Sequence, residues 1–207
     1  MRIDKLQFEV SKSPLKPFIV PLKDSWPTDL KPKHYSYYVL TEIYGIELKN
    51  GEEGVAENIG FIESTFIDIV KIEHANDSVY NVFNAISEDM SSAYNTLTES
   101  NRFSSKFVGK HKNILSLETI HIKDEYSNVA KSVITNIDNI LFHSLGLKIG
   151  CIIMIPLAFY VPKENDQTII KSVNGHDIDT ILRSYMYKLG YKEITDSDFL
   201  YINTDYR

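Results

Sequence analysis

The chain has 207 residues, of which 43% are hydrophobic and 24% are charged. These proportions are ordinary for a globular domain, and the sequence contains no repeat or low-complexity tract. The formal net charge of -6 argues against nucleic acid as a ligand, because binding a phosphate backbone needs a clustered basic surface.

Three local features narrow the class of protein further. The longest apolar run, Ile149–Val161, contains Pro156 and falls short of the about 20 residues that a bilayer span needs, so we expect a core strand and no membrane partner. The N-terminal residues lack an apolar signal segment, which predicts a cytoplasmic protein. Cys151 is the single cysteine, lies in the apolar run, and is expected to be a buried thiol.

The first third of the chain is predicted to be extended. Residues 1–34 contain an alternating strand at Leu6–Val10, followed by a Pro-rich segment that excludes a helix. Tyr35–Leu48 and Glu57–Ile72 carry apolar side chains on both faces, which predicts a hairpin of two strands covered on both sides. We therefore expect an N-terminal strand and extended segment at 1–34 and the main domain at 35–207.

A helix is predicted next. Asn76–Ser100 carries one apolar stripe at i, i+3, i+4 and i+7 spacing, which favours a helix packed on the sheet. Residues 101–112 are polar and basic and are expected to form a surface connection.

The centre of the chain predicts a strand that runs directly into a helix. Leu115–Ile122 has strand composition, and Val129–Leu145 has one apolar helical face, with Asn128 as the N-cap and Gly146 at the end. The first N–H groups of such a helix lack internal partners and carry partial positive charge. The turn between the two elements is therefore a candidate anion site.

The last part of the chain repeats the alternation of strand and helix. Ile149–Val161 is predicted to be a strand, residues 162–176 a loop, and Asp177–Leu189 a helix that ends at Gly190. A closing hairpin is expected at Tyr191–Thr195 and Phe199–Ile202. The order of elements indicates an α/β or α+β domain with a mixed central sheet and helices on both faces.

Two stretches resemble a known superfamily. Residues Leu117–Ile134 place Asp124-Glu125-Tyr126 between an apolar strand and a helix, and Leu182–Tyr191 ends in Lys-Leu-Gly-Tyr. Both are similar to the GNAT superfamily of N-acetyltransferases. The corresponding family motifs are Pro-Glu-Tyr followed by Arg-Gly-x-Gly-x-Gly, and Phe-Tyr-x-x-Leu-Gly-Phe.

The motifs also differ from the family pattern. Ser127 stands where the family has Arg or Gln, and the glycine positions are taken by Asn128, Ala130 and Ser132. Met186 occupies the usual position of a general-acid tyrosine. The resemblance therefore implies degenerate acetyl-CoA and catalytic motifs.

The resemblance implies a GNAT-like mixed central β-sheet flanked by helices, and transfer of an acyl group from acetyl-CoA directly to an amine. The acceptor, a small-molecule or a protein amine, stays open. The catalytic candidates are Glu118, Tyr185 and Tyr187. The implied cofactor-binding residues lie on the strand and in the following turn: Ile120, Ile122, Ser127, Asn128, Val129, Ala130, Lys131 and Ser132.

Structural roles are alternatives for the catalytic candidates. Glu118 and His121 are expected on opposite faces of their strand, where either residue could accept a proton or simply pair across the sheet. Tyr185 lies on the predicted buried stripe of its helix, and Tyr187 is expected at the surface. The six histidines show no metal-ligand spacing, so no metal site is predicted.

Two other functions are compatible with the same sequence. One is a protein-binding module with a GNAT-like fold and weak or absent catalysis, which the altered motifs and the 13 Tyr and 10 Phe residues favour. The other is a self-associating subunit such as a homodimer. Binding of coenzyme A separates the enzyme from the binding module.

Overall fold

The computed structural model of the chain describes residues 3–14, 35–49, 51–99, 102–108, 110–155 and 175–206. The predicted Pro-rich segment beyond Pro14 lies outside the described residues. The end of the predicted strand beyond Ile155 and most of the loop that follows it lie outside them as well.

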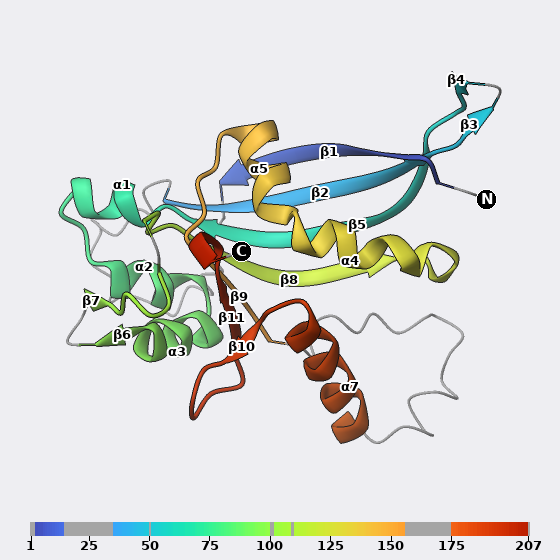
Figure 1. Cartoon of the computed structure of the whole chain (residues 1–207). Coiled ribbons are helices and arrows are strands. Elements are labelled where there is room, and N and C mark those ends of the chain that lie inside the picture. The colour runs from blue at the N-terminus through green and yellow to red at the C-terminus, as the bar shows by residue number, and fades with distance from the viewer. Residues whose placement is uncertain are drawn as a thin grey trace, which may run out of the picture.

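A seven-stranded mixed sheet forms the centre of the structure, in the order β1-β2-β5-β8-β9-β11-β10 (Figure 1). All neighbouring strands are antiparallel except β8 and β9, which are parallel. The strands of this sheet are β1 (Lys5–Pro14), β2 (Ser36–Ile46), β5 (Glu57–Ile67), β8 (Ile114–Ile122), β9 (Cys151–Met154), β10 (Lys192–Glu193) and β11 (Leu200–Asn203). The prediction of a mixed central sheet is confirmed.

Two short ribbons stand apart from the central sheet. One pairs β3 (Leu48–Lys49) with β4 (Glu52–Glu53), and the other pairs β6 (Thr98–Glu99) with β7 (Arg102–Phe103). The first ribbon replaces the simple loop that the sequence predicts between β2 and β5.

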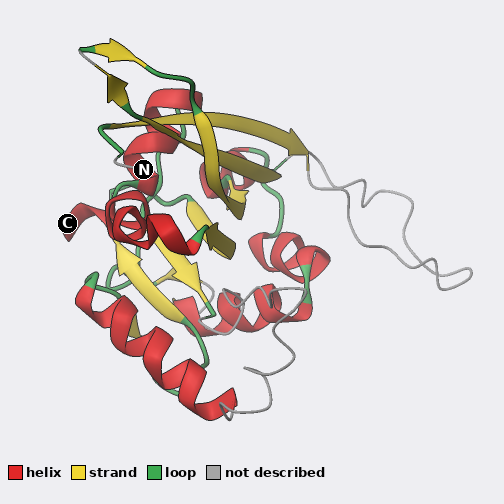
Figure 2. Ribbon diagram, turned by 90° about the vertical axis from the view of Figure 1, so that its right-hand side faces the viewer, coloured by secondary structure: helices red, strands yellow, loops and turns green. Residues whose placement is uncertain are grey.

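Helices lie on both sides of the strands (Figure 2). They are α1 (Ile69–His74), α2 (Val79–Ile86), α3 (Glu88–Leu97), α4 (Ser127–Thr135), α5 (Ile137–Leu145) and α7 (Gly175–Lys188). None of the helices within the described ranges combines the length and the hydropathy that crossing a bilayer requires.

The central strands alternate their side chains between two hydrophobic cores. On β8, Leu115 and Leu117 belong to the main core, whereas Ile114 belongs to a second core on the opposite face. Residues Ile152 and Ile153 of β9 divide in the same way. Helices α4, α5 and α7 cover the main core, and α1–α3 cover the second core. This two-sided burial explains why the predicted central strands are apolar at nearly every position.

The hairpin of β2 and β5 is confirmed, but β5 is shorter than predicted. It ends at Ile67, and the predicted residues up to Ile72 belong to α1 instead. Asp68 ends the strand because its carboxylate accepts a hydrogen bond from the backbone N–H of Lys71 at 3.0 Å and caps the helix.

The single helix predicted at Asn76–Ser100 is two helices. Ser87 adopts an extended conformation between α2 and α3, and its hydroxyl caps α3 by accepting a hydrogen bond from Met90 N–H at 3.1 Å. The apolar stripe nevertheless packs in the second core as expected. The connection at 101–112 is not wholly at the surface, because Phe107 and Val108 are buried in this core.

The helix predicted at Val129–Leu145 is also divided. The backbone starts α4 at Ser127 and breaks at Asn136, before α5. Asn128 is therefore not the N-cap but an exposed residue of the first turn. Gly146 ends α5 with a φ of 69°, as predicted, because glycine tolerates this left-handed conformation.

The C-terminal elements agree with the sequence. Helix α7 starts at Gly175, before the predicted Asp177, and ends at Lys188, before the predicted Leu189. Gly190 follows it with a φ of 92°, and β10 pairs with β11 as the closing hairpin.

The second core should depend strongly on Phe83. Its side chain is fully buried and lies 5.5 Å from the ring of Tyr94 and 6.1 Å from the ring of Phe103, between centroids. We expect Phe83→Ala to reduce the free energy of unfolding by about 3–5 kcal/mol, measured by urea denaturation. Asn84→Ala, at an exposed position of the same helix, is the control and should change it by less than about 0.5 kcal/mol. Equal midpoints for both variants would contradict the packing of this helix.

Candidate functional site

The candidate site lies on the face of the sheet opposite the main core. Tyr38, Leu40 and Phe61 are half-buried there and belong to neither core in the part of the chain that the structure describes. Within the described residues, the prediction that β2 is covered on both faces is confirmed for the face toward the main core and stays a prediction for this one. Two polar residues of β5 lie on the same face: Thr65 is opposite Tyr38, and Glu63 is opposite Leu40.

Two hydrogen bonds connect polar side chains from three neighbouring strands. The Tyr38 hydroxyl donates to Glu63 Oε1 at 2.6 Å. The Thr65 hydroxyl donates to Glu118 Oε1. Glu118 is exposed, so part of its carboxylate stays accessible to solvent and to a ligand. We refer to Tyr38, Glu63, Thr65 and Glu118 as the carboxylate site.

A β-bulge positions Glu118 in this site. Glu63 is opposite Thr119, whereas the next residue, Ser64, is opposite Leu117, so Glu118 is an extra residue in β8. The bulge turns Glu118 and Thr119 toward the same face of the sheet. Without the bulge, successive side chains of β8 would alternate between the two faces of the sheet.

The bulge also corrects the predicted arrangement of Glu118 and His121. His121 stacks on Phe61 with 5.4 Å between ring centroids, and Phe61 shares its face with Thr65, the partner of Glu118. Glu118 and His121 therefore lie on the same face of the sheet, not on opposite faces as the alternation predicts. The prediction fails because it assumes regular alternation along β8, which the extra residue of the bulge interrupts.

The backbone is tightly packed beside this face. A Cβ atom built on Gly60 would lie 2.2 Å from the carbonyl oxygen of His121, a distance that no side chain permits. Glycine is therefore required where β5 approaches the end of β8, at Ile122.

The electrostatics of the site are strongly negative around Tyr38. Its pKa is raised to about 12, first by burial, then by the hydrogen bond to Glu63 and by the negative charges of Glu63 and Glu118. Tyr38 therefore keeps its proton at neutral pH and acts as a hydrogen-bond donor. Since both carboxylates act on one hydroxyl, their charges are concentrated in a small region that favours a cationic ligand.

The strand edge beside the site is only partly paired. The register of β8 with β9 runs from Ile114–Cys151 to Leu117–Met154. Beyond Leu117, β8 continues to Ile122, and no strand within the described ranges pairs with this edge. The candidate residues Ile120 and Ile122 lie on this segment, with half-buried side chains packed against the main core.

The remaining residues predicted to bind cofactor form the first turns of α4. The side chains of Ser127, Asn128, Lys131 and Ser132 are exposed, and those of Val129 and Ala130 are half-buried. No side chain caps this helix. A 3₁₀ turn at Asp124–Tyr126 leads directly into it, so two acidic residues, Asp124 and Glu125, precede the predicted anion site.

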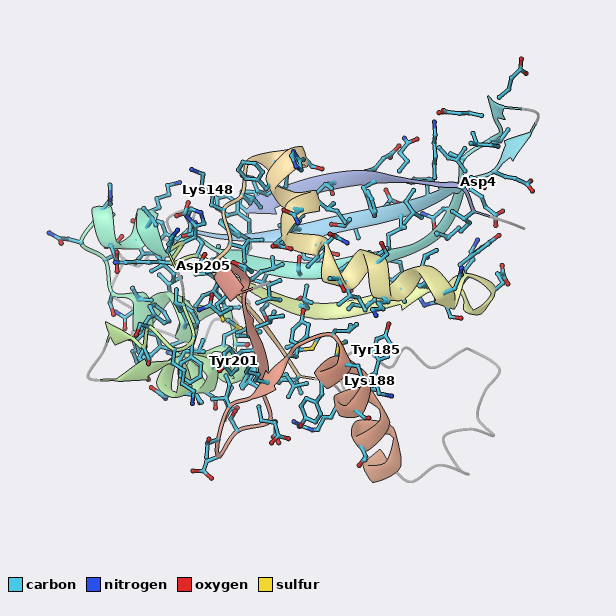
Figure 3. The ribbon with its side chains drawn as sticks, viewed as in Figure 1. Asp4, Lys148, Tyr185, Lys188, Tyr201 and Asp205 are labelled. Atoms are coloured by element: carbon cyan, nitrogen blue, oxygen red, sulfur yellow. The ribbon has the colours of Figure 1, made fainter. Side chains whose placement is uncertain are left out.

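The two candidate tyrosines of α7 lie apart from the carboxylate site. Tyr185 projects toward the sheet and packs against the main core, on the opposite face of β8 from Glu118 (Figure 3). Burial raises its pKa. Tyr187 is 41% exposed and donates a hydrogen bond to Glu193 of β10. Its pKa is raised by burial and by Glu193, against the opposing charge of Arg183.

The structure thus brings Glu118 together with residues that the sequence reasoning did not select, namely Tyr38, Glu63 and Thr65. Tyr38 and Glu63 could have been found from their positions on the less apolar face of each strand. Their pairing depends on strand register, which the sequence alone does not specify.

Among the described residues, no group of three or more His, Cys, Asp or Glu side chains is placed to hold a metal ion. Comparison of the chain with protein-family models, with curated proteins and with solved structures gave no match.

The negative charge of the site can be tested through Tyr38. We expect Glu63→Gln to lower the pKa of Tyr38 from about 12 while leaving it above the ordinary value of about 10, because the burial of the ring persists. Titration of ¹³C-labelled tyrosine by NMR, with Tyr38→Phe to assign the signal, measures this change. Glu52→Gln, an exposed carboxylate of the β3–β4 ribbon, should leave the signal unchanged. A Tyr38 pKa that is the same in Glu63→Gln and wild type would contradict the hydrogen bond.

Proposed function

We propose that the chain is a GNAT-like N-acyltransferase that transfers an acetyl or other acyl group from acyl-CoA to an amine. The observation that carries the proposal is the course of β8. This strand is half of the parallel pair, extends beyond its pairing with β9, and leads directly into α4. Beyond Leu117, where the described strands leave this edge without a partner, backbone groups would be offered to an extended ligand, and the helix start would offer N–H groups to an anion.

The cofactor fits this path in the order of its chemical groups. Its pantetheine arm would pair with the β8 edge at Ile120–Ile122, and its pyrophosphate would lie at Ser127–Ser132. In this arrangement the thioester would lie near the bulge. Since the edge beyond Leu117 lacks a described partner strand, the thioester could be reached from the face that carries Glu118.

The carboxylate site supplies the chemistry for the amine. Glu63 and Glu118 favour binding of a protonated amine, which must lose a proton before it attacks. Glu118, which is exposed, can accept this proton directly or through a water molecule. The amine nitrogen then forms a bond to the thioester carbon, the carbon–sulfur bond breaks, and the sulfur leaves as a thiolate that takes up a proton. Tyr185 on α7 is the candidate donor of that proton, and it would reach the sulfur at the strand edge from the opposite face of β8 to Glu118.

The acidic turn before α4 favours a second candidate function, a GNAT-fold protein-binding module. Glu125, which is exposed in the turn before α4, opposes an anion at the helix start, and Ser127 provides no positive charge. The favourable helix dipole contributes about 0.3–1 kcal/mol at an exposed site, whereas a lost charge-assisted contact costs about 1.5–3 kcal/mol. The balance predicts weak cofactor binding, and its complete absence would leave the binding module as the better account.

We therefore expect acetyl-CoA to bind with a dissociation constant in the high micromolar range, as measured by isothermal titration calorimetry. Ala130→Trp should abolish the binding, because a large side chain at this half-buried position would block the turn. Ala85→Trp, at an exposed position of α2, introduces the same side chain elsewhere and should leave the binding unchanged.

Two results would count against the proposal. Heat that survives Ala130→Trp would place the ligand elsewhere on the protein. No binding at millimolar acetyl-CoA would remove the acyltransferase as an explanation of the β8–α4 arrangement.

A further inference from the structure

A cavity of about 280 Å³ lies at the other end of β8 from the turn before α4. Its walls come from three separate segments: Phe66–Val70, Lys110–Asn113 and Gly146–Lys148. The second segment directly precedes β8, so the strand separates this cavity from the α4 turn by about 27 Å at the usual rise per residue. The cavity is therefore distinct from the proposed acyl-CoA path.

Asn113 holds the three walls together. This residue is buried, and its side-chain amide donates to the carbonyl oxygen of Lys148 at 3.0 Å. Its side-chain oxygen accepts a hydrogen bond from the backbone N–H of Val70 at 3.3 Å. Its backbone carbonyl accepts hydrogen bonds from Gly150 and Cys151 at the start of β9. The walls are thus fixed by the fold before any ligand enters.

Gly150 shows how closely the second segment of the lining, Lys110–Asn113, packs against the start of β9. A Cβ atom at this position would lie 1.3 Å from the carbonyl oxygen of His111. Only glycine permits the segment that carries His111 to pack this tightly on the sheet. The basic side chains of that segment therefore project from a rigid backbone.

The lining is basic in a chain of net charge -6. Lys110, Lys112 and Lys148 line the cavity together with His111, against one carboxylate, Asp68. Phe66, which is buried, supplies an apolar wall. The three lysines and the one carboxylate of this lining therefore sum to a net charge of about +2.

The nearby carboxylates have other partners. Asp68 caps α1 through the N–H of Lys71, and Glu73 forms an ion pair with Lys112 at 2.8 Å. Asp205 accepts a hydrogen bond from the backbone N–H of Lys110, and lies at the same end of the molecule as Lys148 (Figure 3).

Two lysines of the lining have ammonium groups that no described residue binds. The described residues offer neither Lys110 nor Lys148 a side-chain hydrogen bond or an ion pair. Ammonium groups bind phosphate as mobile point charges with up to three hydrogen bonds each. A volume of about 280 Å³ is just below the range of about 300–1,000 Å³ that is usual for pockets of drug-sized ligands, which suits a phosphate group with a small organic body.

We propose that this cavity binds the phosphate group of a small molecule, through Lys110 and Lys148. The proposal is independent of the acyltransferase activity, because it concerns different residues at the opposite end of β8. Binding there would stabilise the junction of β8, β9 and α1, which Asn113 connects.

The test uses the full chain and two probes, inorganic phosphate and glycerol 3-phosphate, titrated by calorimetry at constant ionic strength. Lys148→Ala should weaken phosphate binding by about tenfold or more, and Lys110→Ala combined with Lys148→Ala should weaken it further. Lys188→Ala removes the same charge from an exposed position on α7, well away from Lys148 (Figure 3), and should leave the affinity unchanged. Tighter binding of the ester than of phosphate would identify a phosphorylated small molecule as the ligand, and equal binding would identify the free ion.

Three results would overturn the proposal. The first is no binding of either probe at millimolar concentration. The second is an equal loss of affinity in Lys148→Ala and Lys188→Ala, which would indicate a general effect of net charge. The third is unchanged binding in the double variant, since the two lysines would then not hold the phosphate.

Discussion

The structure depends on β8 being held on both of its edges and buried on both of its faces. Antiparallel pairing with β5 and parallel pairing with β9 fix the strand. Alternation of its side chains divides the molecule into two cores, with Leu115 on one side and Ile114 on the other. Where the pairing with β9 stops, this constraint ends and the bulge at Glu118 begins. The candidate site lies at that transition, where β5 still supports the backbone and the described part of the chain provides no partner for the other edge.

The class of fold is predicted well because hydrophobic periodicity determines it, and this periodicity can be seen in the sequence. Continuous apolar runs identify the central strands, and helical stripes identify the faces that cover them. Boundaries are predicted less well, because single capping residues set them. Asp68 and Ser87 each form a side-chain cap that starts a helix where the apolar pattern shows no break. The pattern of apolar residues alone therefore merges α2 with α3 and extends β5 too far.

The candidate site shows a different limit of sequence reasoning. Glu118 could be selected because it is a carboxylate on a central strand, but its neighbours depend on register and on one inserted residue. The bulge changes which side chains share a face, so Tyr38, Glu63 and His121 join Glu118 only once the pairing of three strands is known. The separation of Tyr185 from this group by the sheet is likewise a consequence of packing. Together these contacts give a negatively charged site beside an edge of β8 that has no partner strand among the described residues.

The central claim is that the edge of β8 beyond Leu117 receives an extended cofactor. Amide hydrogen exchange of Thr119–Ile122, measured by mass spectrometry with and without acetyl-CoA, tests it most directly. If backbone groups of this edge pair with the cofactor, exchange in the segment should slow on binding, while β2 should be unaffected. Binding of acetyl-CoA with unchanged exchange at Thr119–Ile122 would contradict the account.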